Sequence, residues 1–323
     1  MTGPVRLRTQ RHLLGIEDLD SGEVRKLLSR ARELRDLPRL SAERPLVGVS
    51  VVTLFYENST RTRVSFEMAA HKLGASTISV SSSSSSVAKG ETLWDTGRTL
   101  AAMEPGVIVI RHGSPGASLI LAEAMESVGE TIVVNAGDGA HEHPTQALLD
   151  ALTLLDRLET LEGRTIGIIG DIAHSRVARS NVFLLRKLGA RVLLGGPRSL
   201  VPKTLEPLGA FIVRDVDEII EVADAVMMLR VQFERMLGPP AFPSLSDYTR
   251  TYGLTAARAE RMRPRAFVMH PGPMNRGIEI DPEVADGPTS VVAHQVTNGV
   301  AARMAVLERA MEKGPWGPPG SAP

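Results

Sequence analysis

The sequence predicts an α/β fold made of two doubly wound parallel-sheet domains joined by interdomain helices. Three observations support this fold class. Short apolar runs recur along the chain, and several are continuous rather than alternating, as in strands buried on both faces. Helical patterns lie between most of these runs. The length of 323 residues is that of about two domains.

The apolar runs give the expected strands. Eight runs are predicted to be strands, at residues 47–55, 107–110, 131–135, 165–169, 191–194, 211–213, 225–229 and 266–269. The long helical pattern at residues 144–158 separates the first three from the rest. We therefore expect a first domain at residues 1–150 and a second at 151–294. A helix at 295–312 is predicted to return to the first domain, and the Gly- and Pro-rich tail at 313–323 is predicted to be disordered.

Composition excludes several classes of function. The formal net charge is zero, so nothing at the whole-chain level indicates nucleic acid or a membrane surface. The chain has no cysteine, which excludes disulfides, thiolate metal sites and thiol catalysis. No run of about 18 apolar residues appears, and the first residues lack the apolar segment of a signal peptide. We expect a soluble cytoplasmic protein.

The stretch TLFYENSTRTRVSFE at residues 53–67 places Arg61 and Arg63 at the start of a helical pattern. Cations are unfavourable there for the helix itself. The amide groups of a helix N-terminus bind phosphate, and Ser59, Thr60 and Thr62 would add hydroxyl donors. The alternative is simple capping by Ser59 or Thr60 with solvent-exposed arginines. No P-loop is present, and 167–171 matches a dinucleotide fingerprint only weakly, so nucleotide binding is disfavoured.

Other polar residues also follow predicted strands. Ligands of open parallel sheets bind beyond the carboxyl ends of the strands. Arg111 follows 107–110, Arg176 follows 165–169 and its Gly-Asp turn, and Arg230 follows 225–229. With Arg61, four strand ends thus bring Arg to one predicted edge. The sequence His-Pro-Gly-Pro, at residues 270–273, follows the last predicted strand.

His143 and Gln146 lie at the start of the helical pattern in HEHPTQALLD, residues 141–150. Their spacing places them on neighbouring positions of one helix face, where both could contact a small ligand. Two alternatives remain open. His143 could simply cap the helix, or it could bind metal with His141, although no third ligand has recognisable spacing.

Six consecutive serines at residues 81–86 are typical of a flexible linker. Lys89 follows at once, and a lysine on a mobile loop would suit a lid that closes on an anion. On the residues alone, the linker interpretation is the stronger one.

Taken together, these segments resemble the aspartate/ornithine carbamoyltransferase family, and its aspartate branch in particular. The resemblance runs in order from about residue 10 to 310. It rests on Ser-Thr-Arg-Thr-Arg at 59–63, Lys-Gly-Glu-Thr at 89–92, Arg111, His-Pro-Thr-Gln at 143–146, Asp171 with Arg176, Arg-Val-Gln at 230–232 and His-Pro-Gly-Pro at 270–273. Ornithine-specific members typically carry a cysteine in His-Cys-Leu-Pro, which is absent here.

The resemblance implies a site for each substrate. Ser59, Thr60, Arg61 and Thr62 would hold the phosphate of carbamoyl phosphate. Arg111, His143 and Thr62 would polarise its carbonyl oxygen, and Gln146 would contact the carbamoyl nitrogen. The L-aspartate site would consist of Lys89, Arg176, Arg230 and Gln232, with substrate contacts from the backbone of Gly272 and Pro273.

The resemblance also implies an assembly. Ser85 and Lys89 match a loop that reaches the neighbouring subunit's site in a homotrimer, which replaces the linker interpretation of the serine run. Family members commonly assemble with regulatory chains or dihydroorotase. No cofactor and no metal are expected. The alternatives are a carbamoyltransferase for another amino acid, such as ornithine, and an inactive assembly subunit. The arginines at 176 and 230 argue against a cationic substrate.

Overall fold

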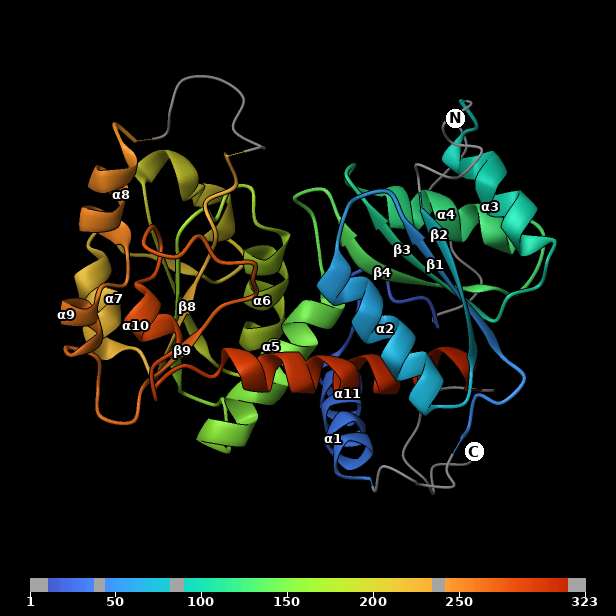
Figure 1. The fold of residues 1–323 in the computed structure, drawn as a ribbon, viewed down its shortest axis with the longest axis horizontal. Coiled ribbons are helices and arrows are strands. Elements are labelled where there is room, and N and C mark those ends of the chain that lie inside the picture. Colours follow the sequence, from blue (N-terminus) through green and yellow to red (C-terminus); the bar gives the residue numbers. More distant parts are fainter. Residues whose placement is uncertain (1–10, 38–43, 82–89, 234–241, 313–323) are drawn as a thin grey trace. The chain divides into compact units, whose positions relative to one another are not determined.

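The computed structural model describes residues 11–37, 44–81, 90–233 and 242–312. The chain divides into two compact units. Unit 1 comprises Met1–Leu149 and Asn298–Pro323, and unit 2 comprises Asp150–Thr297. The chain passes between them inside two helices, α5 (Pro144–Leu158) and α11 (Val292–Met311) (Figure 1). No helix within the described ranges is long and apolar enough to cross a membrane.

Sheet A of unit 1 has the strand order β2-β1-β3-β4, with every neighbouring pair parallel. The two central strands, β1 and β3, are buried over most of their length, because Val, Ile and Leu occupy both faces. A parallel sheet of this kind brings the carboxyl ends of its strands to one edge. The strands are β1 (Ser50–Phe55), β2 (Ser76–Ser81), β3 (Val107–His112) and β4 (Ile132–Asp138).

Helices cover both faces of sheet A. Figure 1 shows α3 and α4 on one face and α2 on the other. Val52, Leu54 and Ile108 alternate along their strands with residues of the opposite face, and they pack against Leu121 and Met125 of α4 in one buried cluster. The helices of this unit, besides parts of α5 and α11, are α1 (Ser21–Asp36), α2 (Thr60–Lys72), α3 (Leu93–Ala101) and α4 (Ala117–Glu126).

Two strand predictions in unit 1 were wrong in detail. The predicted strand 47–55 begins three residues too early, since residues 46–49 form a turn that leaves Val47 70% exposed. Strand β2 was missed because it is a polar, exposed edge strand in which the side chain of Ile78 is 52% exposed. An edge strand of this kind carries no apolar run for the sequence to reveal.

Sheet B of unit 2 has the strand order β7-β6-β5-β8-β9, again with all neighbours parallel. The strands are β5 (Thr165–Ile169), β6 (Arg191–Gly195), β7 (Phe211–Ile212), β8 (Ala225–Met228) and β9 (Phe267–Met269). Helices α6 and α7 lie on opposite faces (Figure 1). The helices are α6 (Arg176–Lys187), α7 (Val216–Val222), α8 (Leu245–Tyr252), α9 (Ala256–Ala259) and α10 (Pro282–Ala285), and two short 3-10 helices lie at Arg198–Leu200 and Lys203–Leu205.

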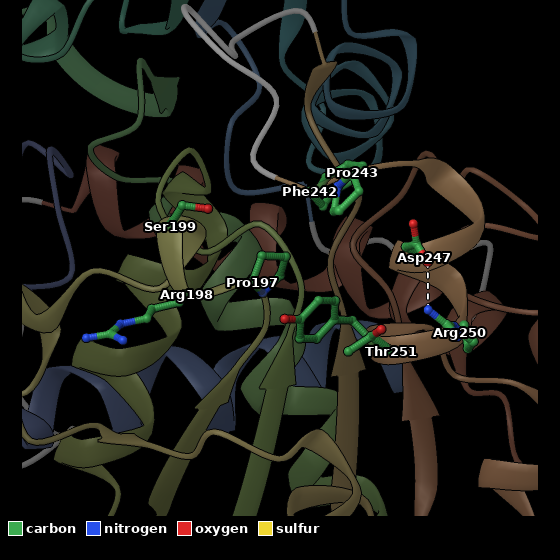
Figure 2. Close-up of a pocket in the computed structure, with 9 residues that line it drawn as sticks. Pro197, Arg198, Ser199, Phe242, Pro243, Asp247, Arg250 and Thr251 are labelled. Carbon is green, nitrogen blue, oxygen red and sulfur yellow. Dashed lines mark hydrogen bonds and ion pairs between the residues drawn. The ribbon is translucent and has the colours of Figure 1, made fainter.

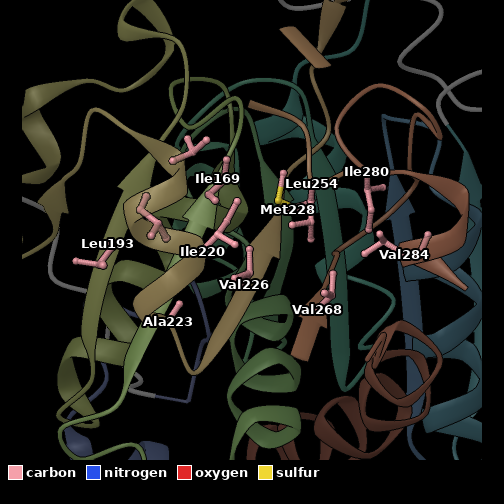
Figure 3. Close-up of a cluster of buried hydrophobic side chains, with 13 residues drawn as sticks. Ile169, Leu193, Ile220, Ala223, Val226, Met228, Leu254, Val268, Ile280 and Val284 are labelled. Atoms are coloured by element: carbon pink, nitrogen blue, oxygen red, sulfur yellow. The ribbon is translucent and has the colours of Figure 1, made fainter. Parts of the chain in front are cut away.

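The core on the α7 face explains the glycines that weakly resembled a nucleotide-binding motif. Figure 3 shows Ile169, Val226 and Met228 of the strands packed with Ile220 of α7. A Cβ added at Gly167 would collide with Cγ2 of Ile219, so this helix could not pack as closely on β5. The glycine therefore serves helix packing.

Candidate active site

The amino end of α2 lies just beyond the carboxyl end of β1. Ser59 is the N-cap residue, yet its hydroxyl makes no capping hydrogen bond within the described residues. Two other helices of unit 1, α1 and α3, are capped by side chains: Asp20 accepts a hydrogen bond from the amide of Glu23, and Thr92 accepts one from the amide of Asp95. The simple capping role considered for Ser59 is therefore wrong.

The first turn of α2 is also unusually cationic. In this described turn no acidic side chain is present, although acidic residues are the ones favoured there. Thr62 is buried, whereas Thr60 and Arg61 are exposed. Although the Arg61 side chain reaches solvent, desolvation of its guanidinium group holds the pKa of Arg61 below its ordinary value, and Arg61 remains charged at neutral pH. Helix dipole, hydroxyl groups and guanidinium groups at one turn are the components of an anion site.

Arg111 lies in β3, in register with the last residue of β1. Its Nη1 donates a hydrogen bond to the carbonyl oxygen of Ala136 at 3.3 Å. Its Nε lies 3.4 Å from Oε2 of Glu57, which follows β1. These contacts hold the guanidinium group between the ends of three strands, close to the amino end of α2. Glu57 was not predicted from the sequence, because its only signal is its place two residues beyond a strand.

His143 lies directly before α5, and its backbone takes part in the first turn of the helix. Its carbonyl oxygen accepts hydrogen bonds from the amides of Gln146 at 3.0 Å and Ala147 at 3.3 Å. The side chains of His143 and Gln146 are both almost wholly buried. Both residues lie at the start of α5, at its first turn. The described residues include no cluster of three His, Cys, Asp or Glu side chains that could hold a metal.

Asp138 organises the loop that carries His143. Its carboxylate accepts hydrogen bonds from the side chain of Asn135 at 2.8 Å and the amide of Gly116 at 2.7 Å, and it lies 3.1 Å from Nδ1 of His141. Burial opposes ionisation, but these hydrogen bonds outweigh it and lower the pKa of Asp138. A fixed carboxylate thus joins β4, the start of α4 and the loop before α5.

In unit 2, the carboxyl end of sheet B is tied together by buried Asp171. Its carboxylate accepts hydrogen bonds from Nδ1 of His174 at 2.8 Å and from the amide of Gln232 at 3.2 Å. The side-chain amide of Gln232 in turn donates to the carbonyl oxygen of His174 at 2.9 Å. The loops after β5 and β8 are therefore joined. Arg176 follows the first of these loops as the first residue of α6, where it is 5% exposed, and Arg230 lies in the second loop.

The loop after β9 is joined to the same edge. His270 accepts a hydrogen bond from the amide of Gly272 at 2.8 Å and pairs with buried Glu279 at 3.2 Å. Asn275 donates to the carbonyl oxygen of Val231 at 3.3 Å. Gly272 has a φ of 63°, a conformation that favours glycine and accounts for Gly at this position. Three loops thus bring Arg176, Arg230, Gln232, Gly272 and Pro273 to one edge of sheet B.

Two family profiles match successive parts of the chain. The profile of the aspartate/ornithine carbamoyltransferase carbamoyl-P binding domain matches residues 11–156, and the profile of the Asp/Orn binding domain of that family matches residues 162–310. The chain belongs to the aspartate/ornithine carbamoyltransferase family. The recognition made from the motifs is confirmed.

Relatives of the carbamoyltransferase family match along nearly the whole chain. The aspartate carbamoyltransferase catalytic subunit of Solibacter usitatus is 53% identical over 301 residues, which is 92% of this chain and 98% of that protein. The Trypanosoma cruzi aspartate transcarbamoylase structure with carbamoyl aspartate and phosphate has a TM-score of 0.81 and 32% identity, covering 95% and 98% of the two chains. Gloeobacter violaceus ornithine carbamoyltransferase has a TM-score of 0.78 and 28% identity, covering 94% and 100%.

Two residues expected in a carbamoyltransferase site, Ser85 and Lys89, lie outside the described residues. A cavity of about 660 Å³ lies beyond the end of β6 in unit 2, and none of the predicted site residues lines it. Figure 2 shows Arg198 and Arg250 on opposite sides of this cavity, with Arg250 paired to Asp247 at 2.7 Å. Because Asp247 and Arg250 neutralise each other, the cavity has no excess of charge on the side of Arg250.

Proposed function

We propose that this chain is an aspartate carbamoyltransferase, which transfers the carbamoyl group of carbamoyl phosphate to the amine of L-aspartate. The products are N-carbamoyl-L-aspartate and phosphate, and the reaction serves de novo pyrimidine biosynthesis. The observation that carries the choice of aspartate is the pair of arginines, Arg176 and Arg230, beyond the ends of β5 and β8, whose loops are joined. Guanidinium groups suit a dicarboxylate. The similarity to proteins named aspartate carbamoyltransferase supports the same choice.

Carbamoyl phosphate is proposed to bind to unit 1. The amides of the first turn of α2, with Ser59, Thr60, Arg61 and Thr62, would hold its phosphate. Arg111, Thr62 and His143 would donate to its carbonyl oxygen, and Gln146 would contact its nitrogen. The contacts of Arg111 with Ala136 and Glu57 support this role, since they restrict the guanidinium group before any ligand binds.

L-Aspartate is proposed to bind to unit 2 through Arg176, Arg230 and Gln232, with Lys89 as a further cation. The backbone carbonyl groups of Gly272 and Pro273 would contact the substrates. The amide hydrogen bond that Asp171 accepts from Gln232 supports this assignment, because it fixes the position of Gln232 in the folded chain.

The proposed reaction needs no covalent enzyme intermediate. The lone pair of the aspartate amine attacks the carbamoyl carbon, the bond to the phosphate oxygen breaks, and the phosphate leaves with the bonding electrons. The proton that the attacking nitrogen loses is proposed to pass to the departing phosphate. Negative charge gathers first on the carbonyl oxygen and then on the phosphate. The cations at the end of β3 and at the start of α2 are proposed to stabilise that charge electrostatically. The remaining contribution is the positioning of the two substrates.

The assay that tests the proposal incubates the full chain with carbamoyl phosphate and either L-aspartate or L-ornithine and measures the ureido product. We expect product with aspartate only. Product with ornithine only would show that the arginines of unit 2 are misassigned and favour the ornithine-type alternative. Absence of product with both amino acids, from a folded chain, would contradict the enzymatic proposal and favour an inactive assembly subunit.

The proposed protein is a cytoplasmic homotrimer in which Ser85 and Lys89 contribute to a neighbouring subunit's site. A regulatory chain or dihydroorotase is a further proposed partner. Mixing Lys89→Ala chains with Arg61→Ala chains tests the shared site. If each site takes these residues from different chains, hybrids regain part of the activity. No recovery despite confirmed subunit exchange would mean that each site is built from one chain.

A further inference from the structure

A second cavity of unit 2 lies at the opposite edge of sheet B from the proposed aspartate site. Its volume is about 300 Å³, and it lies where β5, β8 and β9 begin. The charged residues that line it are Arg157, Glu159, Arg164, Asp224, Arg263 and Arg265. We call it the arginine cavity. None of the residues proposed for carbamoyl transfer lines it.

The charges of the arginine cavity do not balance. Four guanidinium groups face two carboxylates, those of Glu159 and Asp224. Asp224 is already shared: one oxygen lies 3.3 Å from Arg263 and 3.7 Å from Arg164, and the other accepts the amide of Thr165 at 2.8 Å. A single carboxylate that serves two arginines and an amide leaves an excess of positive charge around the cavity, which an added anion would offset.

The backbone conformation of Arg265 also points to a function for this cavity. Residues 263–266 form a turn closed by a hydrogen bond from the amide of Ala266 to the carbonyl oxygen of Arg263 at 2.9 Å. Pro264 occupies the second position of this turn, and Arg265 occupies the third with a φ of 71°. A turn of this kind normally places glycine at the third position, because only glycine adopts a positive φ without a steric penalty.

Glu159 is a second residue of the cavity whose backbone has a positive φ. It follows directly after α5 with a φ of 64°, at a position where helices commonly have glycine. In the described part of the chain, the non-glycine residues with positive φ are Glu104, Glu159 and Arg265. Two of these three line the arginine cavity. Strained backbone persists where the side chain is needed, so the two residues indicate a function for this cavity.

We propose that the arginine cavity binds a small phosphate-bearing anion, with Arg265 and Arg157 contacting it alongside the pair held by Asp224. The planar guanidinium fork matches phosphate oxygens, and several forks around one small cavity suit a diphosphate group. The diphosphate can be free or part of a nucleotide. This inference goes beyond the proposed carbamoyl transfer and does not depend on it.

Titration calorimetry with inorganic pyrophosphate tests the proposal. The full chain carries Arg61→Ala as a background substitution, which weakens the proposed phosphate site of unit 1. We expect one pyrophosphate per chain in this background. Addition of Arg265→Gly weakens binding about tenfold, the loss expected for one charged hydrogen-bonding partner. Adenosine triphosphate forms a second arm: tighter binding than pyrophosphate identifies a nucleotide as the ligand.

Thermal unfolding without ligand separates this function from a structural role. Arg265→Gly removes the strained side chain, so we expect the Tm to rise by about 2 °C although binding is lost. Arg265→Lys keeps the charge and the strain, and it is expected to weaken binding without raising the Tm. Arg214→Gln removes an exposed arginine outside the cavity. It is expected to change neither the binding of pyrophosphate nor the Tm.

Three results would overturn the proposal. The first is absence of stoichiometric pyrophosphate and nucleotide binding in the Arg61→Ala background. The second is equal loss of binding in Arg214→Gln and Arg265→Gly, which would indicate an unspecific effect of net charge. The third is binding of an acidic peptide such as oligoglutamate in place of both phosphate probes, which would make the cavity a docking site for a protein segment.

Discussion

The two proposed substrate sites are built in different ways. In unit 1, Ser59–Arg63 is one continuous segment at the start of α2, and its hydroxyl and guanidinium groups are local neighbours in the sequence. In unit 2, Arg176, Arg230 and Gly272 follow three separate strands. Buried Asp171 connects the loops after β5 and β8, and buried Glu279 fixes the loop after β9. A contiguous anion site thus depends on one helix end. An assembled site depends in addition on buried groups that need not contact any ligand.

The largest effect on activity is expected from the loss of Arg111, which is proposed to contact the substrate directly in unit 1. We expect Arg111→Ala to lower kcat for N-carbamoyl-aspartate formation by about 10²–10³-fold, because one fixed donor to the developing oxyanion is lost. Steady-state kinetics at saturating substrate, with circular dichroism as the check of folding, measure the effect. A folded variant with near-normal kcat would contradict the proposed role of Arg111.

A smaller effect is expected from the buried scaffold of unit 2. Asp171→Asn keeps the shape of the side chain but removes the charge that holds the amide of Gln232 and the ring of His174. We expect the KM for aspartate to rise about tenfold, as for the loss of one charge-assisted hydrogen bond. The KM for carbamoyl phosphate should remain within about twofold.

The comparison between the two sites fails if Asp171→Asn raises both KM values equally. That result would show that the loop network of unit 2 also maintains the site of unit 1. Glu57→Gln is the matched variant, since Glu57 holds Arg111 at 3.4 Å in unit 1. Glu57→Gln is expected to change the KM for carbamoyl phosphate and to leave the KM for aspartate nearly unchanged.

The difference between a contiguous and an assembled site also explains which residues could be predicted from the sequence. The strand-and-helix alternation predicted both parallel sheets, and the rule that ligands bind beyond carboxyl ends singled out Arg111, Arg176 and Arg230. The buried acids that fix the loops, Asp138 and Glu279 among them, were missed. A lone acid in a loop has no periodic pattern, and its partners lie on other strands, so its role emerges only when the chain is folded.

The arginine cavity could not be predicted for a related reason. The sequence shows Arg263, Pro264 and Arg265 as a polar loop, and nothing in it reveals that the third residue adopts a positive φ. The helix end at Glu159 is more than a hundred residues away along the chain. The amino ends of parallel strands bring the two positions to one cavity.

The smallest expected effect concerns the scaffold of unit 1. Buried His12 accepts a hydrogen bond from the amide of Val133 at Nδ1, at 2.9 Å, and its Nε2 lies 3.2 Å from Glu126. The accepting Nδ1 cannot carry a proton, so Nε2 donates to the carboxylate and the ring is neutral. Burial lowers the pKa of His12 and outweighs the opposite influence of Glu126.

A lowered histidine pKa makes the unfolded chain bind more protons than the folded chain between the folded pKa and the ordinary value of about 6.5. Stability is therefore full above pH 6.5 and falls as the pH decreases through that window, by at most about 1.4 kcal/mol per pH unit. Denaturant unfolding of the parent and of His12→Asn at pH 7.5 and 5.5 measures the difference. Asn offers an acceptor to Val133 but does not titrate, so this variant should lose less stability than the parent as the pH falls. An equal loss in both chains would mean that other groups control the acid response.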